Sequence, residues 1–155
     1  MSVPTVRSLT ARDADDARAL VHASLEGTRY LARTLELLET ALGGMDPECA
    51  GMVRVAERSL DALLMHGPIA GATGVEKLHA LVGTDVEALS ELVRVLPGTH
   101  SARMIICELP RAPAHATAAE VLATNGFTRE GSVARFFTED TALDLLVWRR
   151  DDRLP

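Results

Sequence analysis

The sequence is poor in aromatic and in basic residues, and this shortage excludes one class of partner. Its 155 residues include three Phe, one Tyr and one Trp, and the formal net charge is -6. Nucleic-acid binding needs a clustered basic surface for the phosphates, or aromatic side chains on which bases stack. The sequence offers neither, so we expect no nucleic acid as a partner.

Cysteines and long apolar runs are also scarce. The two cysteines, Cys49 and Cys107, match no metal-ligand spacing and are expected to be reduced thiols, so we predict no metal site. The uncharged runs are far shorter than the roughly 20 residues of a membrane span. Residues 1–10 lack a basic region followed by an apolar one. We therefore expect no membrane segment and a cytoplasmic location.

The composition is otherwise that of a folded globular protein. Hydrophobic residues make up 47% and charged residues 25% of the chain, close to the averages for soluble domains. A chain of this length buries one core without disulfides or metals. We predict a single domain over residues 1–155.

Hydrophobic periodicity predicts strands and helices that alternate along the chain. Gly67, Gly71 and Gly74 match no nucleotide-binding pattern and are expected to form a flexible connector. The order predicts an α/β (α+β) fold, a mixed sheet with helices on both faces. The strands are predicted over 3–9, 52–57, 61–66, 75–82, 102–109, 131–137 and 143–149, and the helices over 10–27, 28–43, 84–96 and 114–124.

The stretch 75–96 joins a strand directly to a helix at Gly83, and ligands often bind at such a junction. Thr84-x-x-Glu87 predicts a capping box, in which both side chains accept backbone N–H groups of the first helical turn. Asp85 adds a second acidic residue. A phosphate at this helix start would meet two negative charges and few free donors, so we expect weak phosphate binding.

The carboxyl-terminal third carries a family resemblance. It begins with a buried strand (102–109) and an alanine-rich helix. These are followed by the run Asn-Gly-Phe-Thr-Arg-Glu-Gly at 125–131 and by a closing hairpin whose last strand ends with 145–150. Together with the order of elements, this pattern resembles the GNAT superfamily of CoA-dependent N-acyltransferases over nearly the whole chain. The resemblance implies a mostly antiparallel, twisted sheet whose central strands, ending at Val82 and starting at Ala102, splay apart. It also implies acetyl-CoA or another acyl-CoA in the gap and a small-molecule or peptide amine as acceptor.

Some family features match residue by residue. Glu76, six positions before Val82, stands where several members carry a glutamate general base. The backbone of Ala80, Leu81 and Val82 matches the stretch that pairs with the pantetheine arm of the donor, as an added strand would.

Other family features are missing. The glycine-rich pyrophosphate loop has no counterpart after Val82, where the chain offers only Gly83 and Thr84 for the cofactor. The position of the usual tyrosine acid holds Leu122. His115 replaces the asparagine that usually begins this helix, and Ala118 is retained.

Each candidate residue also has a structural interpretation. Glu76 acts as a base or is a solvated glutamate paired with Lys77. His79 carries a proton if a strand bulge turns it toward the cleft, or has no chemical role. His115 faces the cofactor or only contributes to a turn. Cys107 lies in an apolar run and is expected to be buried and unreactive.

Two functions remain open from the sequence. The first is acyl transfer, in which an amine attacks the thioester while Glu76 or a water takes the proton. The alternative is a GNAT-like module that has lost catalysis and serves in binding or dimerisation, because the loop and the tyrosine are missing. Apolar residues of the closing hairpin exceed what one sheet face buries, which predicts a homodimer. They are Phe136, Phe137, Leu145 and Trp148.

Overall fold

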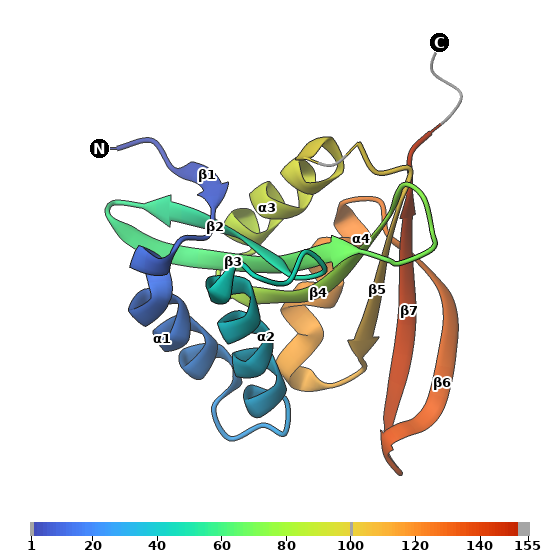
Figure 1. Ribbon diagram of the computed structural model, residues 1–155. Coiled ribbons are helices and arrows are strands. Elements are labelled where there is room, and N and C mark those ends of the chain that lie inside the picture. The colour runs from blue at the N-terminus through green and yellow to red at the C-terminus, as the bar shows by residue number, and fades with distance from the viewer. Residues whose placement is uncertain (1, 100, 152–155) are drawn as a thin grey trace.

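The computed structural model describes residues 2–99 and 101–151. In this part of the chain the strands form one seven-stranded sheet in the order β1-β2-β3-β4-β5-β7-β6 (Figure 1). Every neighbouring pair is antiparallel except β4 and β5, which are parallel. The strands are β1 (Thr5–Ser8), β2 (Ala50–Ala56), β3 (Ser59–Pro68), β4 (Val75–Gly83), β5 (Met104–Pro110), β6 (Thr128–Thr138) and β7 (Thr141–Arg149). The predicted mixed, mostly antiparallel fold class is confirmed.

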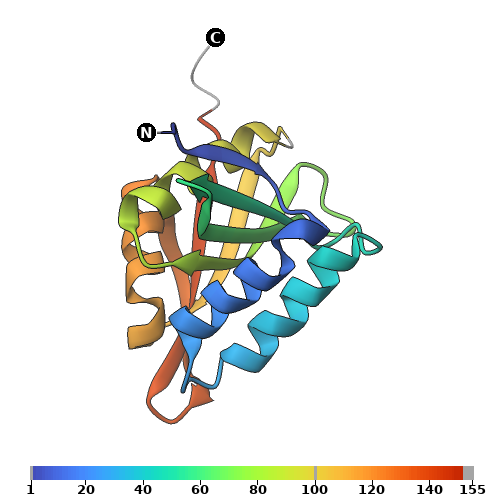
Figure 2. The ribbon, with the colours of Figure 1, turned by 90° about the vertical axis from the view of Figure 1, so that its left-hand side faces the viewer.

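Helices cover both faces of the sheet. Helices α1 (Ala14–Leu25) and α2 (Leu31–Gly43) lie side by side on one face, and α3 (Val86–Thr99) and α4 (Ala116–Thr124) lie on the other (Figure 2). Each pair closes its own apolar cluster, because its inward stripe meets the alternate residues of the central strands. Two short 3₁₀ turns, η1 (Ala11–Asp13) and η2 (Pro113–His115), precede α1 and α4.

The turn between β2 and β3 and the end of α3 differ from the predictions. The β2–β3 hairpin turns at Glu57 and Arg58, which adopt φ of 51° and 72°, and not at Arg58-Ser59-Leu60. Two consecutive left-handed residues are the geometry of a tight hairpin, usually built from Asn and Gly, so this sequence carried no signal for it. Helix α3 continues through Pro97 to Thr99. The φ of proline is itself helical, and the helix continues although Pro97 lacks an N–H donor and its ring crowds the carbonyl four residues earlier.

Gly67 belongs to β3 and not to the connector that the sequence predicts. It pairs with Lys77 of β4. A Cβ atom at Gly67 would lie 1.7 Å from the backbone oxygen of Glu48. The segment before β2 therefore crosses β3 at a distance that only glycine permits.

The closing hairpin buries much of its apolar surface within the same chain. Trp148 packs against the α3–α4 cluster, and Phe137 contacts Tyr30 edge to face with ring centroids 5.8 Å apart. Of the four residues on which the homodimer prediction depends, only Phe136 is strongly exposed, at 55%. The homodimer stays a prediction with a smaller apolar surface behind it. No helix among the described residues has the length and apolarity needed to cross a membrane.

Candidate functional site

The central strands β4 and β5 separate halfway along their length. Their ladder joins only Val75–Leu78 of β4 with Met104–Cys107 of β5. Beyond these positions β3 stays paired with β4 as far as Gly83, and β7 stays paired with β5 as far as Pro110. Each strand is thus held by its outer neighbour while the inner edges diverge (Figure 1). The predicted splay is confirmed.

A bulge at His79 changes which side chains face which layer. Met65 pairs with Ala80 and His66 with Leu78, so His79 has no partner in β3. Leu78 packs in the α3–α4 cluster, whereas Ala80 and Val82 belong to the α1–α2 cluster. The extra residue reverses the alternation of the strand exactly where it leaves β5. It also turns the His79 backbone into the diverging region.

A cavity of about 430 Å³ fills the space between the diverging strands, and we call it the fork cavity. The ends of α1, β4 and β5, the start of α4 and Thr34 of α2 line it. Seven of the eight predicted site residues lie on its wall: His79, Ala80, Leu81, Val82, Gly83, Thr84 and His115. The edge of β4 beyond Leu78 has no ladder partner on the β5 side among the described residues. An extended chain of suitable length can therefore pair with it.

Glu76 is the predicted residue that does not line the fork cavity. It is 4% exposed, and its Oε1 lies 2.6 Å from Nδ1 of His66, which is 2% exposed. Glu76 shares a sheet face with Leu78, two residues on, in the region where β4 and β5 are still paired. The structure therefore places this carboxylate in a buried hydrogen-bonded pair below the fork.

The two histidines of the cavity wall differ in their surroundings. His79 Nε2 lies 3.0 Å from the backbone oxygen of Glu48. A carbonyl accepts only, so Nε2 carries the proton and donates it. His115, half-buried just before α4, stacks edge to face on Tyr30 at 4.6 Å between ring centroids. Burial lowers the pKa of His115 below its ordinary value.

Cys107 on the wall and Leu122 behind it agree with what the sequence indicates about the thiol and the missing acid. Burial raises the pKa of the Cys107 thiol to about 12, so it is no nucleophile near neutral pH. Leu122, at the position of the family's tyrosine, is fully buried in the α3–α4 cluster and lies off the cavity wall. No proton donor therefore occupies that position.

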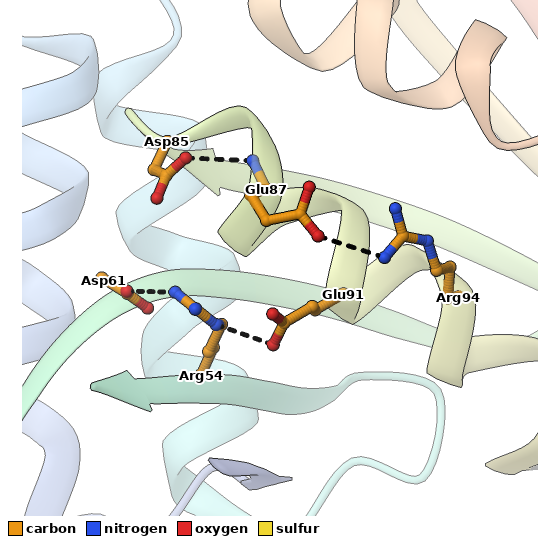
Figure 3. Close-up of polar contacts among 6 residues, drawn as sticks. All are labelled: Arg54, Asp61, Asp85, Glu87, Glu91 and Arg94. Atoms are coloured by element: carbon orange, nitrogen blue, oxygen red, sulfur yellow. Dashed lines mark hydrogen bonds and ion pairs between the residues drawn. The ribbon is translucent and has the colours of Figure 1, made fainter. Parts of the chain in front are cut away.

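The start of α3 is capped differently from the prediction. The Oδ1 atom of Asp85 accepts the backbone N–H of Glu87 at 3.0 Å, and the Glu87 carboxylate pairs with Arg94 at 3.3 Å (Figure 3). The capping box of Thr84 and Glu87 was therefore wrong. The helix begins one residue later than the spacing suggests, so Asp85 becomes the cap and Glu87 sits too early to reach back.

Acidic side chains predominate around this helix start. Arg54 of β2 is bonded to Asp61 of β3 and lies 2.8 Å from Glu91 of α3 (Figure 3). Burial raises the pKa of Asp61, against the opposing effect of Arg54. Arg54 and Arg94 are already paired with carboxylates, and Asp85 accepts the backbone N–H of Glu87 in the first turn of α3. The surroundings are thus poorly suited to a pyrophosphate.

Sequence reasoning missed three hydroxyl-bearing residues of the cavity wall: Ser24, Thr34 and Thr117. Ser24 had a signal, because it interrupts the apolar inward stripe of α1 with a hydroxyl. Thr34 and Thr117 had none, since threonines on helices more often face solvent or bond to their own backbone.

Solved structures resemble this architecture over nearly its full length. A GNAT-family acetyltransferase from Bacillus cereus matches with a TM-score of 0.71 and 12% identity, covering 96% of this chain and 99% of its own. The chain has the GNAT fold.

Two other structures with the GNAT fold carry named acceptors. The aminoglycoside 6'-N-acetyltransferase of Enterococcus faecium matches with a TM-score of 0.75, 14% identity, and coverage of 97% of this chain and 99% of its own. The ribosomal-protein-S5-alanine acetyltransferase of Vibrio fischeri matches with a TM-score of 0.65 and 16% identity, covering 100% of this chain and 97% of its own. No family model and no curated protein sequence matches the chain. At these identities the likeness shows the fold alone.

Proposed function

We propose that this protein is an acyl-CoA-dependent N-acyltransferase that transfers an acetyl or other acyl group to a small-molecule or peptide amine. The observation that carries the proposal is the fork itself. Its cavity reaches both helical layers, and one wall is the unpaired edge of β4 from Ala80 to Gly83. A pantetheine arm can bind to this edge as an added strand and place its thioester at the bulge, while an amine approaches from the α1–α2 side.

The chemistry needs little from the protein beyond positioning. The amine nitrogen attacks the thioester carbon, the C–S bond breaks, and one proton passes from nitrogen to sulfur. Backbone N–H groups near Val82 supply donors for the oxygen that becomes negative during attack. An acidic protein of net charge -6 favours cationic amines as acceptors.

Isothermal titration with acetyl-CoA tests the proposal. We expect saturable binding at one site, weaker than the low micromolar range because the helix start is acidic. The proposal would be contradicted if acetyl-CoA gave no binding heat up to millimolar concentration and CoA did not compete with it. That result would support the alternative, a GNAT-fold module without acyltransferase activity.

Replacing Asp85 by serine is expected to raise the affinity for CoA about three- to tenfold. Serine keeps a capping oxygen, so the helix start survives, while a negative charge near the phosphates disappears. The gain should shrink at 0.5 M salt, where screening acts over about 4 Å. Asp16→Ser, in the first turn of α1, is the matched control and should leave the affinity unchanged. Equal effects of the two substitutions would show that only net charge matters.

A further inference from the structure

Two buried polar atoms on the wall of the fork cavity have no hydrogen-bond partner among the described residues. They are the Oγ atom of Ser24 and the Nδ1 atom of His115. A buried hydroxyl or ring nitrogen without a partner costs about 1–3 kcal/mol. Ser24 belongs to α1 and His115 lies at the start of α4, so the two atoms come from opposite helical layers. Their shared position on one cavity makes both atoms available to a bound molecule.

Aromatic contacts hold the His115 ring without using its nitrogen atoms. Tyr30 meets the ring edge to face, with 86° between the planes, and Tyr30 in turn contacts Phe137. A hydrogen bond of 2.9 Å from Arg29 Nη1 to the backbone oxygen of Phe137 fixes the hairpin against the α1–α2 loop. The imidazole is thus oriented, while Nδ1 keeps its lone pair in the tautomer that is protonated at Nε2.

The other titratable groups near the fork are engaged elsewhere. Glu76 is bound to His66 below the fork, and His79 donates to the backbone of Glu48. Glu108 pairs with Lys77 at 3.2 Å and is 47% exposed. Among the described residues, His115 is the histidine of the cavity wall that has a buried ring nitrogen without a hydrogen-bond partner.

We propose that His115 carries the proton of the transfer reaction and that Ser24 Oγ holds the acceptor amine. This inference rests on the proposed acyltransferase function. As the amine nitrogen forms its bond to the thioester carbon, its proton passes to His115 Nδ1. When the C–S bond breaks, the same proton passes from His115 to the sulfur, which leaves as a thiol. One residue then serves as both base and acid, in place of the absent tyrosine.

The surroundings of His115 keep it neutral when the enzyme is at rest. Burial lowers its pKa from the ordinary 6.5. The ionisable groups around it are Tyr30, which directly precedes α2, His79 of β4, and Cys107 and Glu108 of β5. A second cavity shares His115 and adds Arg111, Arg129 and Asp144. Arg111 and Asp144 neutralise each other at 2.6 Å. The fall in activity that is due to His115 should therefore lie below pH 6.5, and protonation of the acceptor amine adds a separate fall at its own pKa.

The experiment combines binding, turnover and NMR on the full chain. Acetyl-CoA is the donor, and kanamycin and a peptide with an amino-terminal alanine are the acceptor probes. We expect His115→Asn to lower kcat by about 100-fold or more while the affinity for acetyl-CoA changes less than threefold. The fall in activity below pH 6.5 should disappear once rates are corrected for the fraction of neutral acceptor amine, and free imidazole should restore part of the activity of His115→Ala. Ser24→Ala should lower kcat/KM for the amine about tenfold.

A readout without turnover keeps the inference testable for any acceptor. The ring signals of His115, assigned with His115→Asn, should shift when acetyl-CoA binds, while those of exposed His22 stay in place. His22→Asn is the matched control and should leave rate and affinity unchanged. Binding of acetyl-CoA with unmoved His115 signals, or an unaltered pH profile in His115→Asn, would overturn the role of His115. Failure of acetyl-CoA to bind would instead overturn the proposed function.

Discussion

Thr117→Trp should lower the affinity for acetyl-CoA by about 100-fold, or roughly 2.8 kcal/mol. Thr117 is half-buried in the first turn of α4 and lines the fork cavity. An indole ring there occupies much of a space of about 430 Å³. In the proposed complex the pantetheine arm must then give up its pairing with the β4 edge or displace the ring, and either change costs binding free energy. Titration of the variant with acetyl-CoA measures the loss.

Glu120→Trp separates this effect from a general consequence of a large aromatic residue on α4. Glu120 is exposed on the same helix and lines neither cavity. We expect Glu120→Trp to bind acetyl-CoA as tightly as the unaltered protein does. The Tm of both variants should lie within a few degrees of the Tm of the unaltered protein. Equal affinity in Thr117→Trp would place the donor outside the fork.

Gly67→Ala should have the largest effect on stability. The added Cβ would lie 1.7 Å from the Glu48 oxygen, a backbone atom that no side-chain rotation can move. Either the segment before β2 or strand β3 must shift, and β3 is a central strand paired on both sides. We expect a loss of about 3 kcal/mol, which corresponds to roughly 10 °C in Tm for a chain of this size. Thermal unfolding followed by circular dichroism measures it.

Gly43→Ala provides the comparison. Gly43 ends α2, and a Cβ there would meet no atom within 4 Å. Alanine has the higher helix propensity, so this variant should be as stable as the unaltered protein or up to about 1 kcal/mol more stable. A Gly67→Ala protein that melts within 3 °C of the original would show that the crossing segment is loosely held.

The fold could be predicted from the sequence because its elements carry strong local signals. Apolar spacing marks the four long helices, and the uninterrupted apolar run at Met104 to Cys107 marks a strand covered on both faces. The tight turn at Glu57 and Arg58 could not be predicted, because the left-handed geometry is imposed by the paired strands. The cap of α3 was misplaced by one residue, since Thr84 and Asp85 are both good capping residues and spacing alone does not choose between them.

The parts of the candidate site that depend on the course of the backbone could be predicted. The parts that depend on the direction of a side chain could not. The wall from Ala80 to Thr84 follows from the end of a strand. The position of Glu76 could not be predicted in this way. The bulge at His79 shifts the alternation of the strand, so that Glu76 and Ala80 face opposite layers. Counting six residues back from Val82 ignores that shift. The free nitrogen of His115 depends on what all its neighbours bond to, and no local pattern contains this.

The short ladder between β4 and β5 also has a consequence for the assembly of the molecule. Strands β1 to β4 come from residues 5–83, strands β5 to β7 from residues 104–149, and only four paired positions connect the two groups directly within the sheet. The seam joins residues no farther apart in sequence than those that β1–β2 and β5–β7 join within the groups, so its weakness comes from its short length. A donor bound in the fork touches both groups and adds its binding energy to this seam. In the proposed complex, the donor would therefore stabilise the contact between the two groups of strands.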